Sequence, residues 1–267
     1  MNFKIGKVTS GEHEFGEIYH MACAYIIDRS VTVEFNDFAR GEEFHKTFIV
    51  PNGEARQPTR QDAHPGESAN VIRDRYCEGC MKSVCDAIHA KAKQDAWNYP
   101  ACIKNLLTND PKVLLWHRTK KGYKEYRNST PQLIKQLAKF CCDHNTVPIL
   151  IGESGVPNSN CHELVSYWND EFFNEHSIAK QLWCLDALFR NGRTLASLGV
   201  MSGAMDGAAM FFGHKTIFLA RHSDATPRMQ KVSTSVPNLM WHQVEYSRTF
   251  SALAEADLSS IARKIWC

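Results

Sequence analysis

Residues 193–221 restrict the possible folds of this chain more than any other segment. They predict a buried strand, a turn that contains glycine, a short helix and a second buried strand. These four parts cover residues 195–201, 202–203, 205–212 and 215–220. Gly213 stands where helices commonly end in a left-handed cap. A strand that leads through a turn into a helix is the basic unit of an α/β fold, so this class is expected.

The turn at Ser202 and Gly203, with Ala204 after it, predicts an anion site. The first N–H groups of a helix have no partner within the helix, and the helix dipole adds partial positive charge there. Gly203 has no Cβ, so a diphosphate can approach its backbone closely. The same pattern also fits an ordinary strand, turn and helix within an α/β core. This segment alone does not decide between the two interpretations.

Composition excludes several classes of protein. The 267 residues can form one large domain or two small ones with a substantial core. The formal charge of +2 gives no overall basic surface for nucleic acid or an acidic membrane. The N-terminus lacks a basic segment followed by an apolar run, and no apolar stretch is long enough for a membrane span. We therefore expect a soluble, cytoplasmic protein whose 10 cysteines are reduced.

Strands alternate with helices in two halves of the chain. Further strands are predicted at residues 3–9, 31–35, 47–50, 112–116 and 147–151, and helices at 14–28, 69–96, 100–108, 131–141, 178–189 and 251–266. A polar loop is predicted at 51–68, and the turn at 109–111 marks the boundary between the halves. The expected units are domains at 1–110 and 111–250 and a C-terminal helix at 251–267.

Parallel βαβ units place ligands at the carboxyl ends of their strands. In the second half these ends carry polar residues or glycines: His117, Arg118, Gly152, Glu153, Ser154, Ser202, Gly203, Arg221 and His222. Arg118 is permanently charged and can donate two parallel hydrogen bonds to a phosphate, so it is the first choice for that contact. Arg127 and Asn128 lie in the same loop and are further candidates. The alternative is a solvated basic loop.

Residues 198–219 resemble the nucleotide-binding signature of two-domain (GT-B) glycosyltransferases, especially the heptosyltransferase type. The matching residues are Ser202, Gly203, Met205, Ala208, Ala209 and Gly213. Residues 113–153 resemble the start of such a C-terminal domain, and their basic loop is similar to that of the fucosyltransferase-like branch. The chain departs from the pattern at Asp206, where heptosyltransferases tend to have histidine, and it is short for the fold.

The resemblance implies an α/β protein with two Rossmann-like halves facing a cleft, the N-terminal half being abbreviated. Residues 1–110 would be the acceptor-side domain and 111–250 the domain that binds the nucleotide sugar. The implied activity is transfer of a sugar from a nucleotide-diphosphate sugar to a hydroxyl or other nucleophile. The acceptor stays open between a glycan, a protein, a nucleic-acid base and a metabolite. No metal or other cofactor is expected in this scheme.

The resemblance assigns roles to the residues at the strand ends. The donor-binding set is Arg118, Arg127, Asn128, Gly152, Glu153, Ser202, Gly203, Ala204 and Arg221. Glu153 is expected to accept hydrogen bonds from a ribose or sugar hydroxyl, or else to cap a loop. Transfer to a hydroxyl calls for a general base unless the enzyme is retaining. His13 is the first candidate, followed by Glu12 and Asp37, although an exposed loop histidine without a role is the alternative.

Cys77, Cys80, Cys85 and His89 carry side chains that bind zinc in other proteins. In one continuous helix the three cysteines do not share a face, so packed or partly exposed thiols are favoured. A redox pair at Cys77 and Cys80 is a further alternative, although no strand precedes it. Two other functions therefore stay open beside the transferase: a non-catalytic nucleotide- or glycan-binding regulator and a zinc-stabilised interaction module.

Overall fold

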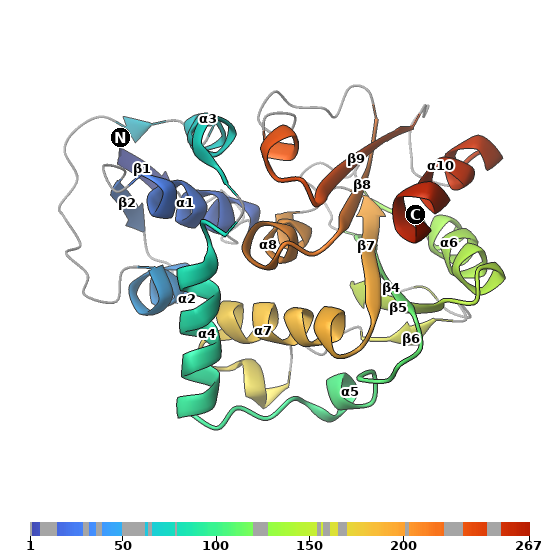
Figure 1. The fold of residues 1–267 in the computed structure, drawn as a ribbon, viewed down its shortest axis with the longest axis horizontal. Helices are drawn as coiled ribbons and strands as arrows, with labels where there is room; N and C mark the ends of the chain where they lie inside the picture. Colours follow the sequence, from blue (N-terminus) through green and yellow to red (C-terminus); the bar gives the residue numbers. More distant parts are fainter. Residues whose placement is uncertain are drawn as a thin grey trace.

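The computed structural model describes residues 2–5, 15–28, 32–35, 39–49, 62–63, 66–77, 79–119, 128–153, 156, 161–164, 170–200, 203–221, 232–244 and 252–267. Within these ranges the chain forms a three-stranded and a six-stranded sheet with helices packed around them (Figure 1). Among the described helices, none combines the length and apolar character that a membrane crossing requires.

The smaller sheet has the strand order β2-β1-β3, and both pairs are parallel. Its strands are β1 (Asn2–Ile5), β2 (Thr32–Phe35) and β3 (Asp62–Ala63). The helices of this half are α1 (Phe15–Ile27), α2 (Ala39–Phe44), the π-helical turn η1 (His45–Ile49), α3 (Gly66–Arg75), α4 (Lys82–Gln94) and α5 (Ala101–Lys104). Helix α1 connects the parallel strands β1 and β2, as a βαβ unit requires.

The larger sheet has the order β6-β5-β4-β7-β8-β9, with every neighbouring pair parallel. Its strands are β4 (Lys112–His117), β5 (Val147–Gly152), β6 (His162–Glu163), β7 (Thr194–Val200), β8 (Thr216–Arg221) and β9 (Leu239–Val244). The helical segments are α6 (Pro131–Asp143), the short 3₁₀ turn η4 (Glu171–Phe173), α7 (Ser177–Arg190), α8 (Gly203–Phe212) and α10 (Glu255–Trp266). Renumbered within the sheet, the order is that of the Rossmann fold.

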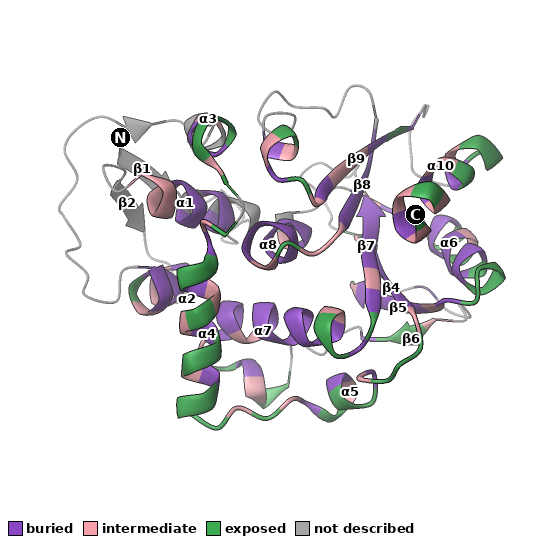
Figure 2. Cartoon of the chain, viewed as in Figure 1, coloured by how far each residue is buried: buried purple, intermediate pink, exposed green. Residues whose placement is uncertain are grey.

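Helices cover both faces of the larger sheet, so most residues of its central strands β4 and β7 are buried and apolar. Alternate residues of β4 enter different cores: Leu114 packs on the α7 and α8 side, and Val113 packs with Leu137 of α6 and Ile261 of α10. The first of these cores also includes Ile18 of α1. Figure 2 shows α7 and α8 mostly buried between the sheet and the N-terminal helices.

Helix α8 contacts α1 and α7 closely at one glycine. A Cβ added to Gly207 would come within 2.8 Å of Leu182 Cδ2 and of two ring carbons of Tyr19. Glycine within a helix costs about 1 kcal/mol relative to alanine, because the backbone is more flexible when unfolded. The close approach explains why glycine occupies this position.

Lys112 is a buried charged residue, 2% exposed, and begins the central strand β4. Its ammonium donates hydrogen bonds to the carbonyl oxygens of Thr108, Asp110 and Gly192 at 2.9, 2.7 and 2.7 Å. Burial is the larger influence and lowers the pKa of Lys112, whereas Asp110 raises it. The three bonds join the segment before β4 to the turn between α7 and β7.

The predicted strands at 112–116, 147–151, 195–201 and 215–220 are confirmed as β4, β5, β7 and β8. The predicted start of α6 is also confirmed, because the Thr130 side chain accepts a hydrogen bond from Leu133 N at 3.2 Å. Gly213 has a φ of +66°, as its predicted cap position requires. These features depend on local sequence.

Two predictions about the N-terminal half are wrong. Of the strand predicted at 47–50, the described residues 47–49 are helical instead, because His45–Ile49 continues α2 as a π-helical turn. Phe44 and Phe48 are four positions apart and their rings lie 5.7 Å apart, so helical spacing buries both. The single helix predicted at 69–96 is divided into α3 and α4 by a turn at Gly79, whose φ is +81°.

Other predicted helices and strands also differ from those in the structure. Helix α5 ends at Lys104, which makes it shorter than the helix predicted at 100–108. Strands β6 and β9 were not predicted. Strand β6 consists of two residues, His162 and Glu163, and both are exposed. So short a segment shows no sequence pattern that would predict a strand.

Gly207→Ala tests the close packing of α8. Helix propensity alone predicts a gain in stability of about 1 kcal/mol. The contacts with Leu182 and Tyr19 instead predict a loss of about 1–3 kcal/mol, because a crowded core must shift. Urea denaturation measures the change, and increased stability would contradict the packing argument.

Candidate functional site

The larger sheet has its topological switch point between β4 and β7. From β4 the chain continues outward through α6 to β5, and it later returns through α7 to β7 on the other side of β4. Trp116 pairs with Gly199, so the carboxyl ends of β4 and β7 lie side by side. In open α/β sheets, ligands bind outside the carboxyl ends at such a point. The residues that follow these two strands are therefore the candidates for a ligand site.

Gly152 brings the end of β5 against the end of β4. Its φ is +101°, and an added Cβ would overlap the His117 carbonyl oxygen. That oxygen accepts a hydrogen bond from Glu153 N at 3.0 Å. A side chain at position 152 would therefore disturb the backbone beside the switch point. The close approach of the two strands therefore accounts for a glycine at position 152 without any contact to a ligand.

Ser129 connects the backbone after β4 to the His117 ring. Arg118 N donates to Ser129 Oγ at 2.9 Å, and Ser129 N donates to Arg118 O at 3.0 Å. The Ser129 hydroxyl lies 2.8 Å from His117 Nδ1 but 3.5 Å from Arg118 O. The closer geometry assigns the hydroxyl proton to His117 Nδ1, which leaves the ring proton on Nε2.

The remaining nitrogen of His117 is a buried donor at the end of the central strand. Nε2 has no hydrogen-bond partner in the part of the chain that the structure describes. Burial is the larger influence and lowers the pKa of His117, and the Glu153 carboxylate raises it to a smaller extent. The ring is therefore neutral at physiological pH and presents one N–H without a partner in that part of the chain.

Glu153 is bonded to the loop that follows β4. Its Oε2 accepts a hydrogen bond from Thr119 N at 2.6 Å and another from the Thr119 hydroxyl. The carboxylate therefore fixes the backbone next to Arg118. A contact between Glu153 and a ribose or sugar hydroxyl stays a prediction.

Helix α8 begins just after β7 and carries a buried carboxylate in its first turn. Asp206 Oδ2 lies 2.9 Å from His20 Nε2 of α1. Each of these residues is 1% exposed. A buried carboxylate requires compensation, and His20 supplies it from the other half of the chain. This contact fixes the N-terminal part of α8 relative to α1.

The predicted donor-binding residues that the structure describes follow neighbouring strands at one edge of the larger sheet. They are Arg118, Asn128, Gly152, Glu153, Gly203, Ala204 and Arg221, with only the backbone described for Arg221. The other predicted site residues lie outside the described residues: Glu12, His13, Asp37, Arg127 and Ser202. Their roles therefore stay predictions.

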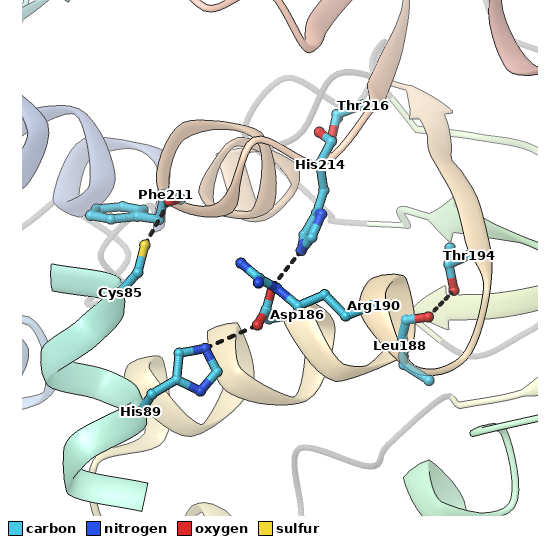
Figure 3. A network of polar contacts seen from close by, with 9 residues as sticks. All are labelled: Cys85, His89, Asp186, Leu188, Arg190, Thr194, Phe211, His214 and Thr216. Carbon is cyan, nitrogen blue, oxygen red and sulfur yellow. Dashed lines mark hydrogen bonds and ion pairs between the residues drawn. The ribbon is translucent and has the colours of Figure 1, made fainter. Parts of the chain in front are cut away.

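A second buried carboxylate, Asp186, receives three hydrogen bonds from different segments (Figure 3). His214 Nε2 and Arg190 Nε lie 2.8 and 2.7 Å from Oδ1, and His89 Nε2 lies 3.0 Å from Oδ2. Burial by itself would raise the pKa of Asp186, but the hydrogen bonds and charges of His214 and Arg190 outweigh it and lower that pKa. The carboxylate joins α4, α7 and the turn before β8.

The cysteines and histidine considered as zinc ligands have separate surroundings. Cys85 Sγ donates to Phe211 O at 2.7 Å, and His89 is bonded to Asp186. Cys77 and Cys80 lie instead in the turn between α3 and α4. Within the described ranges, no group of three or more histidine, cysteine, aspartate or glutamate residues is arranged to hold a metal ion.

Sequence reasoning missed His20 and Asp186 because their partners are distant in the chain. Asp206 offered a signal, since it is a lone charge in the apolar stretch of α8 and a buried charge needs a partner. The signal does not identify His20, which lies 186 positions away. Asp186 likewise lies within a largely apolar buried helix.

No protein-family model matches the chain, and no curated protein matches its sequence. Among solved structures, the chain is similar to E. coli ADP-heptose LPS heptosyltransferase II, with 9% identity, a TM-score of 0.48 and coverage of 98% of this chain and 96% of that chain. It is also similar to E. coli heptosyltransferase WaaC with ADP, with 11% identity, a TM-score of 0.46 and coverage of 99% of this chain and 97% of that chain.

Asp186→Asn tests the buried network through its pH dependence. At neutral pH we expect a loss of about 1–3 kcal/mol, because the donors around position 186 lose a charged acceptor. The folded-state pKa of Asp186 is lowered, so its stabilising effect is present above the ordinary value of 3.8 and is lost as pH falls through the folded-state pKa. Urea denaturation of both proteins at several pH values measures the difference.

The matched control is Asp143→Asn, which changes an exposed carboxylate paired with Lys139. We expect little change in stability at any of these pH values, because an exposed pair is screened by water. A difference between wild type and Asp186→Asn that stays constant through acidic pH would contradict the role given to the Asp186 charge.

Proposed function

We propose that this protein is a glycosyltransferase that moves a sugar from a nucleotide-diphosphate sugar to a nucleophile of an acceptor. The observation that carries the proposal is the position of the segment resembling the GT-B signature. Helix α8 follows β7 in the chain, β7 pairs with β4, and Arg118 follows β4 directly. Rossmann order, a helix N-terminus and an adjacent arginine together favour a diphosphate ligand.

The donor diphosphate is proposed to lie between the start of α8 and the end of β4. Gly203 and Ala204 supply backbone N–H groups there, and Arg118 supplies positive charge. Negative charge grows on the leaving phosphate as the glycosidic bond breaks, so donors already held in place lower the barrier. His117 adds a candidate hydrogen-bond donor, because its neutral ring carries the proton on Nε2.

The outer part of the donor site is proposed to be formed by the remaining donor-binding residues, which follow the strands of the larger sheet. Asn128 is adjacent to Ser129, whose backbone pairs with Arg118, and so it belongs to the same edge. Arg127 and Arg221 are further candidates for contacts with phosphate. Ser202 is proposed to contribute the turn before α8. Gly152 and Glu153 are proposed to form the side of the site near the ribose. This scheme uses no metal, since the helix N-terminus and the arginines supply the positive charge.

The acceptor is proposed to bind across a cleft from the donor, on the half formed by residues 1–110. His13 is the preferred general base, with Glu12 and Asp37 as alternatives. A histidine suits this role because its ordinary pKa lies near neutral pH, so it can accept a proton from a hydroxyl as the sugar transfers. A glycan, a protein, a nucleic-acid base and a metabolite are all suitable acceptor classes to test.

The first experiment is a thermal-shift screen of the purified protein with UDP, GDP, ADP, CMP and their sugar conjugates, with and without a zinc chelator. A ligand that binds only the folded state raises its melting temperature. We expect a selective shift with one nucleoside diphosphate and release of that diphosphate from its sugar conjugate when acceptors are added. Binding without release would favour the regulator, and unfolding on chelation without any nucleotide shift would favour the zinc module.

Arg118→Ala tests the proposed phosphate contact. We expect donor affinity to fall by about 1.5–3 kcal/mol, because charged hydrogen bonds to the diphosphate are lost. Calorimetric titration with the nucleoside diphosphate that gives the largest thermal shift measures this change. Arg263→Ala, at an exposed position of α10, is the matched control and should bind normally. Equal affinity of Arg118→Ala and wild type would remove Arg118 from the site.

A further inference from the structure

The turn between α3 and α4 contains the sequence Cys77-Glu78-Gly79-Cys80. Cys80 N donates a hydrogen bond to Cys77 O at 3.1 Å, which closes a four-residue turn. Gly79 has a φ of +81°, a conformation that glycine adopts without a steric cost. The two cysteines therefore occupy the first and last positions of a fixed turn.

This turn brings the two side chains together. In a hydrogen-bonded turn the first and last Cα atoms lie within about 7 Å, and a disulfide requires about 4.4–6.8 Å. The backbone geometry of the turn therefore suits a disulfide between Cys77 and Cys80.

The surroundings give the two thiols different access. Cys77 is exposed and Cys80 is half-buried. Cys23 of α1 lies near enough to Cys80 to influence it electrostatically, but Cys23 is completely buried. A small oxidant in solution can therefore reach Cys77 first, with Cys80 as its neighbour and Cys23 inaccessible.

We propose that Cys77 and Cys80 form a reversible dithiol–disulfide site that reacts with low-molecular-weight disulfides. The Cys77 thiol loses its proton to solvent, and the thiolate attacks one sulfur of the small disulfide. A mixed disulfide forms and one small thiolate leaves. Cys80, after losing its proton, attacks the Cys77 sulfur and releases the second small thiol. The protein dithiol loses two electrons and the small disulfide gains them.

The neighbouring contacts connect this turn to α8. Tyr76 donates from its hydroxyl to Met210 O at 3.2 Å, and Cys85 donates from Sγ to Phe211 O at 2.7 Å. These residues flank the turn on both sides and hold the last part of α8. The redox site is independent of the proposed glycosyltransferase activity, because its chemistry needs neither a nucleotide nor an acceptor.

The test is equilibration of the full-length protein in glutathione buffers of increasing oxidation, followed by acid quenching, alkylation of free thiols and peptide mass spectrometry. We expect an intramolecular Cys77–Cys80 disulfide that disappears again in reducing buffer. Exposed Cys142 and Cys267 serve as internal references, and they should carry glutathione where they react. Buried Cys23 should stay reduced throughout.

Two single variants separate the steps. Cys80→Ser should accumulate glutathione at Cys77, because the second thiol is missing. Cys77→Ser should lose the intramolecular disulfide and show at least tenfold less modification at Cys80, because Cys80 is less accessible. The proposal is overturned if wild type shows only glutathionylated Cys77, or if both thiols stay reduced while Cys142 and Cys267 react.

Discussion

The buried contact between Asp206 and His20 joins helix α8, which follows strand β7, to helix α1. Asp206 lies in the first turn of α8, and His20 lies on α1 at a distance of 2.9 Å. Removing one partner of a buried hydrogen-bonded pair leaves the other unsatisfied, which typically costs about 1–3 kcal/mol. Gly207 has no Cβ, and this allows Tyr19 to pack closely against the same helix. Polar pairing and packing thus hold α1 against the helix that begins at the switch point.

The end of β4 is fixed by a second set of short contacts. Gly152 permits close approach of β5, and Ser129 holds both the Arg118 backbone and the His117 ring. Glu153 fixes Thr119 on the other side of Arg118. A site formed by side chains and backbone that are already held loses little conformational entropy when a ligand binds. This arrangement explains why an anion site at this edge is physically reasonable.

Local sequence predicted the larger sheet better than it predicted the contacts around it. The Thr130 cap, the apolar strand β4 and the Gly213 cap each depend on neighbours in sequence, and all were recognisable. The strand predicted at 47–50 overlaps the π-helical turn His45–Ile49, because a short apolar run does not distinguish strand from helix until its packing is known. The pairing of Asp206 with His20 depends on tertiary structure, so it could not be read from spacing.

Helix α8 is held at both ends by residues that precede the larger sheet. Asp206 contacts His20 in its first turn, while the Met210 and Phe211 carbonyl oxygens accept hydrogen bonds from Tyr76 and Cys85 near its end. A rotation of α1 and α4 away from α8 would break these contacts together and expose a buried carboxylate. A large opening between these described helices is therefore energetically unfavourable. A ligand at the start of α8 would meet a helix whose position is set before binding, and any closure around it must come from segments that these contacts do not restrain.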